Sequence, residues 1–108
     1  MVTPSAITNT HIENALINIR DMLADMPELA SEHDTGVLPE DERISWSLDW
    51  DQAMGTDLRI LDQADNAARL NEDQQRRYHE VIKSLREGLP LIRRLGLSEP
   101  TVPLDEAA

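Results

Sequence analysis

Apolar residues recur along this chain at alternating spacings of four and three, and this spacing constrains the fold more than any other feature. It places side chains on one face of an α-helix, whereas a strand would send them to both faces. One such stripe lies in the first part of the chain and consists of Ile12, Leu16, Ile19, Leu23 and Met26. Another lies near the end and consists of Tyr78, Ile82, Leu85, Leu89 and Ile92. The two stripes predict a fold built from amphipathic helices.

The first stripe predicts a helix over Thr10–Met26. Thr10 and Glu13 match a capping box, in which each side chain accepts a hydrogen bond from the other residue's backbone amide. Thr3-Pro4 offers an earlier start, because proline suits the first position of a helix. Pro27 should end the helix, because proline disfavours helical geometry at the residue before it.

Residues 28–43 are interpreted as a connection, because they hold a glycine, a proline and three consecutive acids. A connection of this length is unusual in a compact domain and is either functional or mobile. The second helix is expected from about Ser45 or Ser47 to Leu70. Its apolar face carries large residues and also small ones that would let a neighbouring helix approach closely. The face consists of Trp46, Trp50, Met54, Leu61, Ala64 and Ala68, is widened by Leu58 and Ile60, and is made flat by its alanines together with Ala53, Gly55 and Ala67.

A turn is predicted between the second and third helices, because Asn71 is a good N-cap and Gln74 stands at the capping-box position. These two helices should therefore form an antiparallel hairpin. The last apolar stripe continues through Gly88 and Pro90, which predicts a third helix that is kinked or split near Pro90. Gly96 suits the end of this helix.

The length of 108 residues is typical of one domain, and apolar residues make up 40% of it, enough for a core. Only 3% of the residues are aromatic, and such an aliphatic composition favours packed helices over a β-sandwich. We therefore expect an all-α fold: a three-helix bundle made of a helical hairpin and an N-terminal helix. Residues 1–97 should form this single domain, and residues 98–108 should form a flexible acidic tail that contains prolines.

The formal net charge of −11 argues against binding to nucleic acid or to an anionic membrane. This charge is unevenly spread. Residues 1–68 carry 14 acids and 3 bases, whereas residues 69–95 carry 7 bases and 4 acids. An acidic helix that packs beside a basic one would explain the difference. Alternatively, a basic stripe meets an acidic partner, or an acidic surface meets a basic one.

The sequence lacks the motifs of several functional classes. It has no cysteine, which excludes disulfides, thiolate metal sites and a cysteine nucleophile. Its first 19 residues have no basic start and no continuous apolar run, so we expect no signal peptide. No stretch of the sequence is long and apolar enough to span a membrane, so we expect a cytoplasmic location. Glu-x-x-His, Gly-x-Ser-x-Gly and glycine-rich phosphate loops are also absent. We therefore assign no catalytic residue, cofactor or metal.

Asp57 is the most informative single residue, because an α-helical wheel places it in the middle of the second helix's apolar stripe. A carboxylate is costly to bury unless it is paired. Arg20, His79 and Arg86 are the candidate partners for a structural hydrogen bond or salt bridge. Alternatively, this face lines a pocket or a partner groove, where a carboxylate with a shifted pKa would mark a site.

Four other residues are candidates for partner binding. Trp46 and Trp50 lie one turn apart and face the same way, which suits core packing or, if exposed, an interface hot spot. Arg86 and Arg93 are seven residues apart and flank the last stripe, as charges flank the seam of a coiled coil. They suit surface salt bridges, or they fix the register of a second chain.

Three function classes remain open. The first is a non-enzymatic protein–protein interaction or regulatory module that self-associates, which rests on the flat alanine and glycine face, the uneven charge and the missing catalytic set. The second is an acidic nucleic-acid mimic that inhibits a basic protein, which requires carboxylates spaced like phosphates. The third is a small helical metal-dependent hydrolase that uses Asp57, Asp62, Asp65 and His79. We favour the first, with another protein or a second copy as partner and no direct contact with nucleic acid or membrane.

Overall fold

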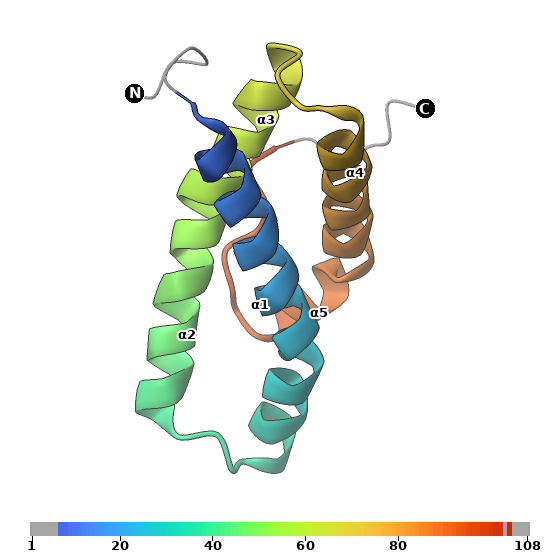
Figure 1. The fold of residues 1–108 in the computed structure, drawn as a ribbon. Helices are drawn as coiled ribbons and strands as arrows, with labels where there is room; N and C mark the ends of the chain where they lie inside the picture. Colours follow the sequence, from blue (N-terminus) through green and yellow to red (C-terminus); the bar gives the residue numbers. More distant parts are fainter. Residues whose placement is uncertain (1–6, 103, 105–108) are drawn as a thin grey trace.

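A computed structural model describes residues 7–102 and 104, and within them the regular elements are helices, with no strand (Figure 1). The all-α prediction is therefore confirmed for this part of the chain. The structure divides it into more elements than the three helices expected. In chain order they are α1 (Asn9–Thr35), α2 (Glu40–Gln52), the π-helical segment η2 (Ala53–Asp57), α3 (Leu58–Asn66), α4 (Glu72–Glu87) and α5 (Leu89–Arg94).

The start of α1 is capped by Thr8, two residues before the cap that the sequence suggested. The Thr8 hydroxyl accepts from the His11 amide, and Nδ1 of His11 accepts from the Thr8 amide, both at 3.2 Å. The predicted capping box of Thr10 and Glu13 is therefore wrong, and Glu13 is left to pair with other side chains. The alternative start at Thr3-Pro4 lies outside the described residues.

The predicted end of the first helix at Pro27 is wrong, because α1 continues through this proline to Thr35. A proline inside a helix loses one hydrogen bond and crowds the preceding turn. Here the turns on either side are held by the core, since Met26 and Ala30 are buried. The helix ends instead at Gly36, whose φ of 74° is the left-handed conformation that favours glycine.

The long connection expected over residues 28–43 is also wrong. The chain between α1 and α2 spans only residues 36–39, and α2 begins at Glu40. Three consecutive acids, which we interpreted as part of a loop, occupy the first turn of α2. They suit that position because the N-terminus of a helix carries a partial positive charge.

Residues 40–66 form one uninterrupted helical run, in which η2 joins α2 to α3. The amide of Leu58 bonds to the carbonyl of Ala53, five residues back, instead of four. A turn with this spacing holds an extra residue. The side chains that follow it are therefore rotated about the helix axis relative to their positions in an unbroken α-helix. Leu58 is consequently fully buried at 0% exposure, whereas Asp57, expected in the middle of the stripe, is only half-buried. The run ends at Asn66, short of the predicted end at Leu70.

The turn before α4 matches the sequence prediction. Asn71 caps the helix and forms a reciprocal capping box with Gln74, with distances of 2.8 and 3.1 Å. At the other end, α4 stops at Glu87 and α5 begins at Leu89, so the boundary falls at Gly88. Pro90 lies in the first turn of α5, where a proline costs no helical hydrogen bond.

Helix α1 lies between the two other parts of the bundle (Figure 1). It packs against η2 and α3 on one side and against α4 on the other. In the view of Figure 1, the chain after α5 passes behind α1 and returns toward the end of the bundle where α3 lies. This segment contributes to the packing, because Leu97, Val102 and Leu104 contact the core and the indole Nε1 of Trp50 donates to the Ser98 carbonyl at 2.8 Å.

Candidate interaction groove

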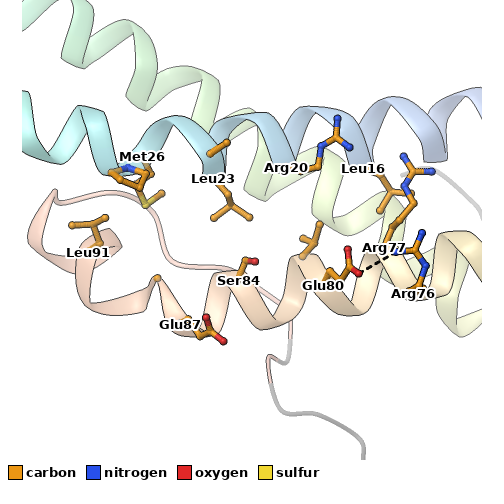
Figure 2. A pocket seen from close by; sticks show the side chains of 14 residues that line it. Leu16, Arg20, Leu23, Met26, Arg76, Arg77, Glu80, Ser84, Glu87 and Leu91 are labelled. Atoms are coloured by element: carbon orange, nitrogen blue, oxygen red, sulfur yellow. Dashed lines mark hydrogen bonds and ion pairs between the residues drawn. The ribbon is translucent and has the colours of Figure 1, made fainter.

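A groove of about 680 Å³ runs between α1 and the α4–α5 segment (Figure 2). Leu16, Met26 and Val81 form part of its apolar lining and are buried in the core. Leu23 and Leu91 also line it and are only half-buried. Figure 2 shows Leu23 and Met26 on α1 facing Leu91 on α5 across the groove. The groove therefore offers apolar surface that the chain itself does not cover.

One end of this groove carries three arginines, which Figure 2 shows gathered at the same side. Arg76 pairs with Asp73 at 2.6 Å and with Glu80 at 3.1 Å, and Arg77 pairs with Glu13 at 2.8 Å. The pKa values of Arg76 and Arg77 are raised, because hydrogen bonds to these carboxylates stabilise the charged guanidinium groups.

Arg20 differs from the other two arginines of the groove. Its side chain is 66% exposed, and its guanidinium lies 3.7 Å from the carboxylate of the adjacent Asp21, too far for a strong hydrogen bond. A contact of this kind is weak and readily exchanged. Arg20 therefore has the greatest capacity of the three to pair with an incoming carboxylate.

Gln74 ties α1 to α4 near the arginine end of the groove. It is 2% exposed, and its amide nitrogen donates to Asn9 at 2.7 Å and to Glu13 at 2.9 Å. The hydrogen bond from Gln74 to Glu13 lowers the pKa of Glu13 most, and the hydrogen bond from Arg77 lowers it further. The sequence predicted the role of Gln74 in capping α4, but not this second role, because the spacing along one helix says nothing about the neighbouring helix.

Replacing Gln74 with alanine should lower the free energy of unfolding by about 1–3 kcal/mol, because it removes half of a capping box and leaves polar groups on α1 without their partner. Urea denaturation followed by circular dichroism measures the change. Gln52→Ala is the matched control, because Gln52 is exposed on α2. An equal loss of stability in both variants would contradict the role assigned to Gln74.

The structure places Trp46 and Trp50 in contact, with stacked rings whose centroids are 5.5 Å apart. Trp50 is fully buried, so it has no free surface to offer a partner. Trp46 is half-buried and lines a second recess between α1 and α2. Three carboxylates lie around this recess, those of Asp21, Asp25 and Asp49.

The Asp57 carboxylate accepts a hydrogen bond from a side-chain amide and not from a basic side chain. Nδ2 of Asn18 on α1 donates to its carboxylate at 2.6 Å, whereas the sequence suggested Arg20, His79 or Arg86 as partners. Burial raises the pKa of Asp57, and the hydrogen bond from Asn18 lowers it in part. The π-helical segment orients this carboxylate toward Asn18. The hydrogen bond therefore links η2 to α1.

The two arginines singled out in the sequence both contact the segment that follows α5. A guanidinium nitrogen of Arg86 donates to the Leu104 carbonyl at 3.3 Å, and Arg93 pairs with Glu99 at 3.1 Å. These contacts involve part of the segment 98–108, whose last four residues and Pro103 lie outside the described residues. The five residues predicted as a partner site are therefore spread over several places.

The small residues that the sequence placed on the second helix do not form one flat face. Ala53 and Ala64 are buried in the core, whereas Gly55, Ala67 and Ala68 are exposed. The groove, by contrast, was missed by sequence reasoning. Its one sequence signal is the concentration of bases between residues 69 and 95, because Arg76 and Arg77 belong to that region.

No protein family model, no curated protein and no solved structure matches this chain. Over residues 7–102 and 104, no three histidine, aspartate or glutamate side chains are arranged to hold a metal ion. In the same part of the chain, no helix combines the length and apolar character needed to cross a bilayer. The groove and the uneven distribution of charge are the features of this molecule that point to a function.

Proposed function

We propose that this chain is a non-enzymatic protein-interaction module that self-associates through the groove between α1 and the α4–α5 segment. The observation that carries the proposal is the uncovered apolar surface of Leu23 and Leu91 in a groove whose other end carries the three arginines. Grooves of this kind bind amphipathic helices, whose apolar residues enter the groove while charged residues pair at its rim.

The distribution of charge supports a second copy as the occupant. The whole chain has a net charge of −11, so two copies repel each other in most orientations. The α4–α5 part of the groove belongs to the region with more bases than acids. Association is favoured only where this region of one copy meets the acidic region of another.

We also infer that the helical elements form three packing units, each of which we call a rod. The uninterrupted run from residue 40 to residue 66 supports treating α2, η2 and α3 as one rod. The short boundary at Gly88 supports treating α4 and α5 as one rod with a bend near Pro90. In this description α1 is the central rod, and the groove lies between α1 and the bent rod.

Sedimentation velocity from about 10 µM to about 1 mM tests the self-association. The wild-type chain should show a mass that rises with concentration. Leu23→Glu should weaken this association at least about tenfold, because it places a charge on the apolar lining. Leu23 is half-buried, so circular dichroism must show that the variant folds.

Ile17→Glu is the matched control for Leu23→Glu. Ile17 lies on the same helix, is 41% exposed and does not line the groove. The control should associate like the wild type. A wild-type chain that is monomeric at every concentration, or equal weakening by both substitutions, would contradict the proposed function.

A second candidate function is favoured by the recess beside Trp46. The carboxylates around it come from two helices, Asp21 and Asp25 on α1 and Asp49 on α2. An acidic surface of this kind suits a nucleic-acid mimic that occupies a basic protein. A 1:1 complex with a basic nucleic-acid-binding protein that dissociates as salt rises, and is lost in the Asp21→Asn, Asp25→Asn double variant, would favour this function over self-association.

A further inference from the structure

The outward face of α2 is apolar where solvent reaches it. Ile44 is 47% exposed and Leu48 is 62% exposed, and both are among the few large apolar residues of the described chain that remain so open. They lie four residues apart, which places them side by side on the helix. This face is opposite to the one that carries Trp46 and Trp50. Trp50 is buried, Trp46 is half-buried against the core, and Ile44 and Leu48 are exposed to solvent.

Acids flank this apolar pair on the same side of α2. Glu40 and Asp41 precede Ile44 by four and three residues, and both are exposed. The one base nearby is Arg43, which lies 3.6 Å from Glu40. The outward face of α2 is therefore an amphipathic helical surface of apolar and acidic residues, the chemistry that the groove and its arginine end would accept.

The lengths of the two surfaces agree. Helix α2 has 13 residues, which corresponds to about 20 Å at the α-helical rise. The α1 side of the groove extends from Leu16 to Pro27, which corresponds to about 17 Å. The outward face of α2, which belongs to the longer helical run over residues 40–66, is therefore long enough to span the groove.

A chain cannot place its own α2 in its own groove. Figure 1 shows α2 and α4 on opposite sides of α1, and α1 packs against η2 on one side and α4 on the other. We infer that the groove of one copy receives the outward face of α2 from a second copy, with Ile44 and Leu48 against the lining near Leu23 and Leu91. This inference rests on the proposed self-association and names the surface that occupies the groove.

The contact joins two different surfaces, so each copy offers one groove and one α2 face. This arrangement allows a mixing test with two variants in the full chain. The first is Leu23→Glu, which has a damaged groove and an intact α2 face. The second is the double variant Ile44→Glu, Leu48→Glu, which has an intact groove and a damaged α2 face.

Each variant alone should sediment as a monomer, with self-association weakened at least about tenfold. An equimolar mixture should form a 1:1 complex, because one intact groove then meets one intact α2 face. Val37→Glu, Ile17→Glu is the matched control for the double variant, since it adds the same charge at exposed apolar residues outside both surfaces. The control should associate like the wild type.

Three results would overturn the inference, and they differ in what they say of the proposed function. If the Ile44, Leu48 variant associates like the wild type while Leu23→Glu does not, the groove is used but α2 is not its occupant. If both variants are monomeric and their mixture is also monomeric, the two surfaces do not meet each other. If the wild type itself is monomeric, the proposed self-association fails, and the inference fails with it.

Discussion

Replacing Trp50 with alanine is expected to lower the free energy of unfolding by about 3–5 kcal/mol, the range for truncating a large buried aromatic residue. Trp50 is fully buried, stacks on Trp46 and donates to the Ser98 carbonyl. Its loss would leave a cavity beside α2 and remove one of the hydrogen bonds that hold the segment after α5. Chemical denaturation followed by circular dichroism measures the change.

Two further variants separate the contributions of Trp50. Trp50→Phe keeps most of the apolar ring and removes the hydrogen bond to Ser98, so it should cost less than the alanine variant. Trp46→Ala should also cost less, because Trp46 is only half-buried. A Trp50→Ala chain as stable as the wild type would show that this residue does not belong to the core.

Leu58→Ala is the second substitution with a large expected effect, a loss of about 2–5 kcal/mol. Leu58 is 0% exposed, because η2 shifts it into the middle of the buried stripe. Asp57→Ala should cost less than about 1 kcal/mol, because it removes one hydrogen bond, to Asn18, at a half-buried position. The comparison tests the π-helical turn, because an unbroken α-helix would place Asp57 in the middle of the apolar stripe and Leu58 at its edge.

Urea denaturation of the two variants, made in the same background, gives this comparison directly. The order of the two effects matters more than their size. A larger loss for Asp57→Ala than for Leu58→Ala would mean that the helical run from residue 40 to residue 66 keeps a regular α-helical phase and that η2 is not formed.

The apolar stripes made much of the fold predictable. Ile12, Leu16 and Ile19 are all buried on α1, and Tyr78, Ile82 and Leu85 are buried on α4. A stripe needs only the geometry of one helix, which the sequence alone supplies. The capping box of α4 was predictable for the same reason, because its residues are three apart in the chain.

The failures arose where contacts from elsewhere in the chain override local preference. Pro27 should have ended α1, but Met26 and Ala30 on either side of it are buried in the core. The π-helical turn shifts the phase at one point, so a wheel that assumes a constant rotation misplaced Asp57. No local sequence pattern predicted the continuation of α1 through Pro27 or the π-helical turn, because helix propensity is a weak guide where tertiary packing competes with it.

The candidate site was less predictable than the fold. The groove combines Leu23 on α1 with Leu91 on α5, and their approach depends on how the two helices pack. The sequence pointed instead to Trp50 and Arg93, which the structure places in the core and in a pair with Glu99. The residues singled out from the pattern of one helix therefore make contacts within the chain. The uncovered apolar surface of the groove forms only when the helices pack together, so the pattern of one helix does not predict it.

Amide NMR spectra of the wild-type chain at increasing concentration show, residue by residue, whether the groove binds a second copy. Between about 20 µM and about 1 mM, we expect concentration-dependent shifts at residues 16–27 and 80–91 and on α2, with α3 largely unchanged. Spectra that do not change with concentration, or shifts confined to surfaces away from the groove, would show that the groove does not bind a second copy.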